Sequence, residues 1–220
     1  MSQPINMTGM VLFTAPSGDY DRRVILLTKE CGKITAFARG ARRPTHPLLS
    51  AAVPFNFGSF QLYVGRNAYT LASAHIDQYF GELKTDLEGS FFGSYFMELA
   101  GYYGRENLDA SDMLNLLYVS LKALINPRIP NVLVRYIYEI RLMVINGEFP
   151  QDAADTEGLL DSAKYAMHHI ITSDLRSLYT FTVSDEVMAQ IIALQDPIRR
   201  RTIDMKLKSL QILEEIAGAG

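Results

Sequence analysis

The strongest constraint on the fold is a change in hydrophobic periodicity near residue 80 of this 220-residue chain. Before that point, short apolar segments alternate with glycine, proline and charged residues. After it, apolar residues recur every four positions, as in Leu83, Leu87 and Phe91. The first pattern is typical of strands and the second of amphipathic helices. The sequence therefore predicts an α+β protein with a β domain at residues 1–80 and an all-α domain at residues 81–220.

The β domain contains five segments rich in aliphatic, aromatic and β-branched residues, which is the composition of strands. They are residues 7–13, 23–28, 34–38, 57–64 and 68–76. Glycine in the intervening segments 30–33 and 65–67 permits tight turns. Five short strands suit a small barrel, and the five-stranded OB-fold is the natural candidate. The strand count alone does not separate it from an SH3-like barrel.

The helical domain is expected to contain six helices, with an acidic irregular loop at residues 148–157. The helices are predicted at residues 83–103, 113–124, 132–145, 159–171, 184–194 and 197–216. Ser184 forms part of a capping box, although the expected Glu is displaced to Glu186. Pro197 is expected to begin the last helix, because proline is favoured in the first helical turn.

The net charge of −3 conceals an asymmetry between the two domains. Residues 1–80 hold eight Lys or Arg against four Asp or Glu, a net charge of +4. The remainder holds thirteen basic and twenty acidic residues, a net charge of −7. A basic N-terminal domain on an acidic body predicts a polyanionic partner on one side only.

Most of the basic residues of the β domain lie in or beside strand ends, and three of them fall in the loop at residues 39–47. In a small barrel they can converge into a positive groove that follows a phosphate backbone. The candidate phosphate contacts are Arg22, Arg23, Lys29, Lys33, Arg39, Arg42 and Arg43. Tyr20, Phe37 and Tyr63 are candidates to stack on bases. Tyr20, in a charged loop, is the best of them, whereas packing in the core is favoured for Phe37 and Tyr63. A solvated surface loop would show the same charge.

No motif for enzymatic chemistry occurs in the sequence. There is no GxSxG elbow, no phosphate-binding Walker loop and no GxGxxG. His168 and His169 are adjacent on a predicted helix, so their side chains point about 100° apart and cannot share a metal ion. Cys31 is the single cysteine, without a CxxC pair for zinc. We therefore expect a protein that is not an enzyme and that has no cofactor and no metal.

The sequence also predicts where the protein acts. Its first residues lack a basic segment followed by a long apolar one, so no secretory signal is expected. No stretch approaches the roughly 18 consecutive apolar residues of a membrane span. A single cysteine fits a reducing compartment. A cytoplasmic protein without a membrane partner is expected.

Several segments of the β domain resemble those of one bacterial family. Residues 18–28 (GDYDRRVILLT) are followed by Gly32-Lys33 and then by residues 38–44 (ARGARRP). This order resembles the N-terminal signature of the RecO recombination mediators, and residues 9–12 (GMVL) belong to it. Weaker likenesses follow at residues 54–55, 61–63, 138–142, 146–147 and 208–210.

The resemblance implies an OB-fold domain that binds single- and double-stranded DNA, joined to a helical domain. Members of the family anneal complementary strands. With RecR they help to load RecA onto DNA coated by single-strand-binding protein, whose acidic C-terminal tail is a further expected partner. The resemblance thus implies a nucleoid-associated protein of recombinational DNA repair.

The chain departs from the family in one respect. Many relatives carry paired zinc-binding cysteines after the third helix, and residues 148–157 contain none here. The helical domain is therefore expected to lack zinc. Two other functions fit the residues as well: a protein-interaction scaffold whose basic barrel binds acidic peptides, and an RNA-binding OB protein.

Overall fold

The computed structural model describes residues 3–150 and 152–218, which form two compact units. The barrel unit comprises Met1–Lys84 and Met97–Leu114, and the helical unit comprises Thr85–Phe96 and Asn115–Gly220. A single cut in the sequence does not separate these units, because two helices contribute residues to both. These helices are α3 (Leu87–Tyr103) and α4 (Ser111–Ile125).

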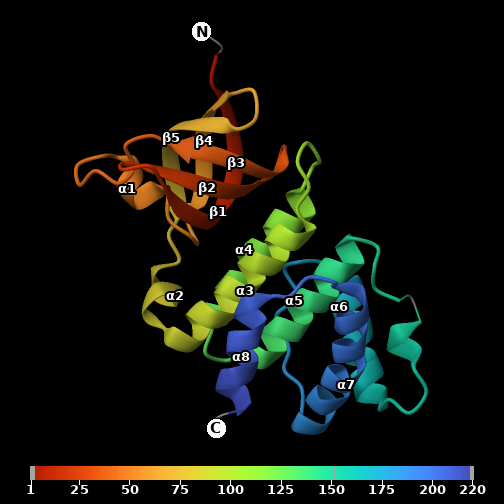
Figure 1. Ribbon diagram of the computed structural model, residues 1–220. Coiled ribbons are helices and arrows are strands. Elements are labelled where there is room, and N and C mark those ends of the chain that lie inside the picture. The colour runs from red at the N-terminus through yellow and green to blue at the C-terminus, as the bar shows by residue number, and fades with distance from the viewer. Residues whose placement is uncertain (1–2, 151, 219–220) are drawn as a thin grey trace. The chain divides into compact units, whose positions relative to one another are not determined.

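The barrel unit is built on five strands that close on themselves in the order β1-β2-β3-β5-β4 (Figure 1). The strands are β1 (Ile5–Ser17), β2 (Asp21–Thr28), β3 (Gly32–Ala38), β4 (Phe57–Val64) and β5 (Tyr69–Gln78). All neighbours are antiparallel except β3 and β5, which pair in parallel. The prediction of an α+β protein with a five-stranded OB-fold barrel is confirmed.

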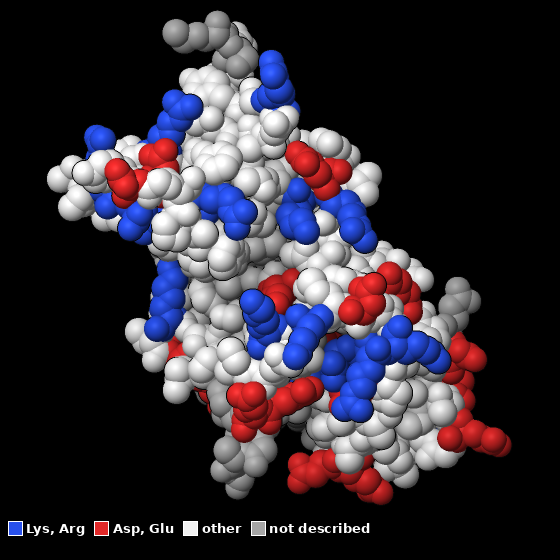
Figure 2. Space-filling model, in the orientation of Figure 1, with Lys and Arg blue, Asp and Glu red and all other residues white. Residues whose placement is uncertain are grey.

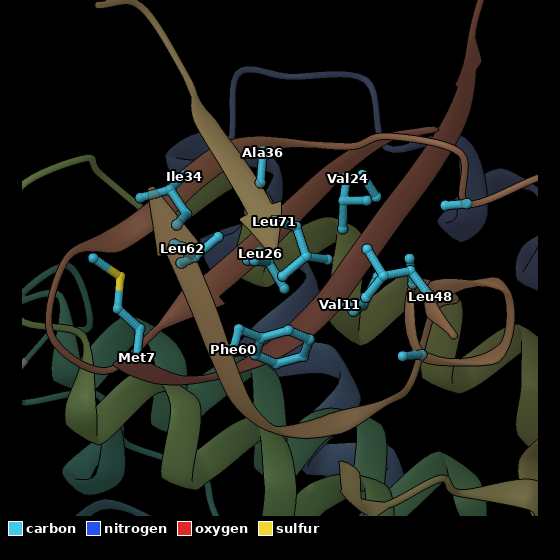
Figure 3. Packing of buried hydrophobic residues seen from close by; sticks show 14 residues of the cluster. Met7, Val11, Val24, Leu26, Ile34, Ala36, Leu48, Phe60, Leu62 and Leu71 are labelled. Atoms are coloured by element: carbon cyan, nitrogen blue, oxygen red, sulfur yellow. The ribbon is translucent and has the colours of Figure 1, made fainter. Parts of the chain in front are cut away.

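The strands alternate inward apolar residues with outward residues, as the pleat requires. Figure 3 shows the inward side chains of all five strands meeting in one cluster, including Val24 and Leu26 of β2 and Phe60 of β4. These three side chains are fully buried. The short helix α1 (Leu48–Ala51), which the sequence did not predict, adds Leu48 to the same cluster.

A hairpin-like segment between α3 and α4 packs on the β2–β3 turn within the barrel unit. The backbone amide of Lys33 donates to the carbonyl of Arg105 (3.2 Å), and that of Ala110 donates to the carbonyl of Lys29 (3.0 Å). Gly32, at the tip of the turn, has φ +64° and bridges to Glu106. These backbone bonds explain why Met97–Leu114 belongs to the barrel unit.

The helical unit is organised around α5 (Asn131–Ile145), which is buried along most of its length. Two helices pack on it and on each other: α6 (Asp161–Thr172) and α7 (Asp185–Thr202). The unit also contains α8 (Lys208–Gly218). Ser184 caps α7, because its hydroxyl accepts from the amide of Val187, as the partial capping box indicated. No helix in the described part of the chain is long and apolar enough to cross a membrane.

Two helix predictions were wrong in their boundaries. The helix expected at residues 83–103 is two helices, α2 (Gly81–Thr85) and α3, because Asp86 accepts the first hydrogen bond of the second helix through its carbonyl. The helix break expected before Pro197 lies instead at residues 203–207. Proline inside a helix costs about 3 kcal/mol. Burial of Ile191 and Ile198 on either side of Pro197 offsets that cost.

Candidate nucleic-acid interface

The outer surface of β1, β2 and β3 carries an arginine between aromatic and aliphatic side chains. Arg23 lies opposite Ala15 on β1 and opposite Phe37 on β3. The neighbouring cross-strand pair joins Phe13 to Ile25. Because Val24 points into the core, Arg23 and Ile25 point outward. We call these five residues the outer platform: Phe13, Ala15, Arg23, Ile25 and Phe37.

The outer platform exposes aromatic surface to solvent. Phe13 is 51% exposed, and Phe37 is half-buried. The expectation that Phe37 packs in the core is wrong, because Ala36 and Ala38 occupy the inward positions beside it. Tyr63, also expected in the core, is exposed. Exposed rings beside a cation form the kind of surface on which unpaired bases stack.

Phe13 was missed by the sequence reasoning for a physical reason. The segment from Gly9 to Phe13 is continuously apolar, so its pattern does not show which residues face outward. A β-bulge between Val11 and Phe13 shifts the register of β1 on β2. A bulge changes which side chains share a face. No pattern in the sequence marks this bulge.

The loop at residues 39–47 is bound to the β1–β2 loop through Arg42. Its Nη1 atom donates to the carbonyls of Gly18 and Asp19, both at 3.1 Å. Its backbone amide donates to the carbonyl of Tyr20 at 2.9 Å. The guanidinium of Arg43 lies over the Tyr20 ring, 4.8 Å from its centroid. Tyr20 is 54% exposed, so Tyr20 and Arg43 together present a flat cationic surface.

Arg22 has a different role from its neighbour. Its Nη1 atom donates to the carbonyls of Leu49 (2.8 Å) and Ala52 (3.0 Å), at the two ends of α1. The side chain is half-buried in this position. Arg22 thus holds α1 on the barrel, and one of its guanidinium nitrogens is already used in hydrogen bonds.

Lys29 and Lys33 lie at the opposite end of the β2–β3 hairpin from Arg23. Arg23 and Lys29 are six positions apart along the chain, which corresponds to about 20 Å in a strand. The Nζ atom of Lys33 donates to the carbonyl of Gly101 at 2.5 Å. Burial and the nearby Arg105 guanidinium lower the pKa of Lys33. The structure therefore separates these two lysines from the arginines with which they were grouped.

Arg23 of the outer platform and the nearby Arg39 have exposed side chains without a bonding partner in the described residues. In residues 3–150 and 152–218, no hydrogen bond or ion pair holds the side chain of Arg23 or Arg39. Arg39 follows β3 directly, two residues beyond Phe37. Phe37 also pairs with Thr70 near the start of β5. Because β3 and β5 are parallel, the β4–β5 turn, with the exposed Arg66, precedes this pair and lies on the side away from Arg39. Arg66 was not among the predicted contacts.

Figure 2 shows Lys and Arg side chains spread over the barrel with few Asp and Glu between them. This distribution agrees with the net charge of +4 for residues 1–80.

The family model described as "Recombination protein O N terminal" matches these same residues, 1–80. A DNA repair protein RecO of Acetivibrio thermocellus is 24% identical over 96% of this chain and 97% of its own length. One of Symbiobacterium thermophilum is 29% identical over 97% of this chain and 98% of its own. Residues 1–80 thus match the N-terminal domain of the RecO family, and the whole chain is similar to RecO proteins.

A third relative, the DNA repair protein RecO of Bacillus subtilis, is 29% identical over 65% of this chain and 56% of its own length. The likeness to RecO proteins thus extends beyond the barrel into the helical part. The matches to the Acetivibrio thermocellus and Symbiobacterium thermophilum proteins span nearly the whole of both aligned chains.

The described residues of the acidic loop do not offer a zinc site. Residues 148–157 contain no cysteine, and no three His, Cys, Asp or Glu side chains gather around a common point in the described residues. Packing holds the loop instead. Ala153 and Ala154 are buried, and Asp155 lies 3.1 Å from His168 of α6. These residues do not fit a zinc ion.

Proposed function

We propose that this protein is a DNA-binding recombination mediator of the RecO family that acts without enzymatic chemistry. The outer platform carries the proposal, because it sets Arg23, which has no partner in the described residues, opposite the half-buried Phe37 and diagonal to the exposed Phe13. Duplex bases already stack on each other, so exposed rings favour single-stranded DNA. Arg39, which directly follows β3, extends the positive surface.

The roles of the predicted site residues differ in this proposal. Arg23 and Arg39 contact phosphates directly, and Tyr20 with Arg43 offers a flat cationic surface to a base. Arg22 and Arg42 shape the loops around the site. Lys29 is exposed and can meet a strand that continues along the hairpin, whereas Lys33 stabilises the fold.

Neutralised phosphates lower the repulsion between two strands, so complementary bases can meet. This is the physical basis of strand annealing in the proposed function. In the cell, the protein would act at the nucleoid in the cytoplasm. There, with RecR, it would help to load RecA onto DNA covered by single-strand-binding protein. The acidic tail of that protein is a further proposed partner.

The test is the salt dependence of single-strand binding by a variant carrying Arg23→Gln and Arg39→Gln. Each lost phosphate contact reduces the slope of log K against log salt by about 0.7 on single strands, so two contacts reduce it by about 1.4. Arg128→Gln with Arg176→Gln is the matched control, because both arginines are exposed in the helical unit. Fluorescence anisotropy of a labelled oligonucleotide measures both slopes.

An unchanged slope in a well-folded variant would contradict the proposal. Tighter binding of an RNA strand than of the matched DNA strand would instead favour an RNA-binding protein. Displacement of DNA by an acidic peptide, with annealing unaffected by the arginine substitutions, would favour a protein-interaction scaffold. Replacing Phe13 and Phe37 with alanine should weaken binding by about 1–3 kcal/mol for each base that stacks.

A further inference from the structure

A second basic segment lies in the otherwise acidic helical part of the chain. Residues 199–208 hold five Lys or Arg and one Asp, a net charge of +4. The rest of residues 81–220 has a net charge of −11. We call residues 199–208 the α7–α8 segment, since it spans the last turn of α7 and the first residue of α8. Such a local reversal of charge needs a physical explanation.

The α7–α8 segment presents exposed cations. The Arg200 side chain is 70% exposed and lies 3.7 Å from Asp196. Arg201 and Lys206 are exposed, and neither forms a hydrogen bond or ion pair within the described part of the chain. Arg200 and Lys206 line a hollow of about 220 Å³, together with Met205 and with Glu214, whose carboxylate faces Arg199. Cations and an apolar side chain thus meet at one surface depression.

One arginine of the segment, Arg199, also lines the hollow, but its charge is compensated. Arg199 is only 7% exposed and lies near three carboxylates. They belong to Glu139 (3.7 Å), Asp196 (3.3 Å) and Glu214 (3.5 Å). These carboxylates compensate the charge of Arg199. The positive potential of the segment therefore comes from the exposed residues.

Stabilisation of α7 explains only part of this charge. Cations in the last turn of a helix interact favourably with its dipole. Arg199, Arg200 and Arg201 occupy that turn. Lys206 lies beyond the end of the helix, where the dipole effect has fallen off. A polyanionic ligand accounts both for the arginines in the last turn of α7 and for Lys206 beyond it.

We propose that the α7–α8 segment is a second binding site for the phosphate backbone of a single DNA strand, separate from the barrel site. The proposal rests on the proposed function of the barrel. With one site on each unit, a single chain holds two strands at once. The strands can then be brought together for annealing without a second protein molecule.

The test counts DNA strands for each protein chain. The full chain is saturated with a short non-complementary oligonucleotide, and the complexes are counted by native mass spectrometry. Wild type is expected to bind two strands. Arg201→Gln with Lys206→Gln is expected to bind one strand and to lose annealing activity. The exposed pair Arg128→Gln and Arg176→Gln removes the same charge from the helical unit and should still bind two.

The outcomes separate this proposal from the function proposed for the barrel. If wild type binds one strand and Arg23→Gln with Arg39→Gln abolishes binding, the second site is refuted and the barrel site stands. If Arg201→Gln with Lys206→Gln still binds two strands, the second site is also refuted. If Arg23→Gln with Arg39→Gln leaves the count at two, the barrel function fails. Circular dichroism melts confirm that each variant is folded.

Discussion

Glu139 of α5 is the buried carboxylate of the helical unit, and its replacement by glutamine tests how the unit is held together. The Glu139 side chain is 1% exposed. One carboxylate oxygen accepts from Arg135 Nε at 2.8 Å and from the Tyr95 hydroxyl at 2.7 Å. The other lies 3.7 Å from Arg199 Nε. Glutamine keeps the shape and an acceptor for Tyr95. It removes the charge and replaces the oxygen that faces Arg199 and Gln195 with an amide donor.

The expected loss of unfolding free energy depends on which carboxylates remain near Arg199 and Arg135 in the variant. Arg199 still lies near Asp196 and Glu214, so part of its charge remains compensated. Arg135 is 11% exposed, and Glu139 is its ion-pair partner within the described residues. Removing one partner of a buried ion pair typically costs 3–5 kcal/mol. We therefore expect Glu139→Gln to lower the free energy of unfolding by about 3–5 kcal/mol.

Urea unfolding followed by far-ultraviolet circular dichroism measures the change, because the helices dominate that signal. The double variant Arg135→Met with Glu139→Gln is the control. It removes the charge that Glu139→Gln leaves uncompensated, so it should be more stable than the single variant. A loss below about 1 kcal/mol, as at an exposed pair, would refute the reasoning. A double variant no more stable than Glu139→Gln would refute it too.

Two further predictions concern backbone geometry and pH. Gly32→Ala should destabilise the barrel unit more than Gly18→Ala, although both glycines have φ +64°. Each substitution costs about 1–2 kcal/mol for the left-handed conformation. A methyl group at Gly32 also meets the carbonyl of Arg105, a contact that has no counterpart at Gly18. Equal losses of stability for the two variants in thermal melts would contradict the packing described. Hydrogen bonds from the backbone and hydroxyl of Ser177 lower the pKa of Asp174 below its ordinary 3.8. The resulting stabilisation is present above pH 3.8 and is lost as pH falls through the lower folded-state pKa. The difference in free energy of unfolding between wild type and Asp174→Asn should therefore shrink as the pH falls below 3.8.

The sequence predicted most of the fold because its local signals are strong. All five predicted strand segments lie within observed strands or within a residue of them. Turn glycines and aliphatic composition mark such strands directly. The errors arose where tertiary packing overrides a local signal. Pro197 marks a helix start by local preference, yet α7 continues through it because the helix is buried on both sides of the proline.

The candidate site was less predictable, because charge in a sequence does not show what a side chain contacts. Strand alternation could have distinguished Arg22 from Arg23, since Val24 and Leu26 mark the inward positions of β2. Nothing in the sequence places Lys33 against the carbonyl of Gly101, which is 68 residues away. The partner of Lys33 is a backbone carbonyl, and carbonyls leave no signature in a sequence.

These contacts decide which substitutions can test DNA binding. Removing Arg39, Arg42 and Arg43 together would combine two effects, because Arg42 holds the β1–β2 loop through the carbonyls of Gly18 and Asp19. A loss of binding by that triple variant would not separate a lost phosphate contact from a displaced loop. Arg23 and Arg39 make no such contacts in the described residues. Their replacement therefore changes the charge of the site while its shape is kept, which makes the salt slope a direct measure of phosphate contacts.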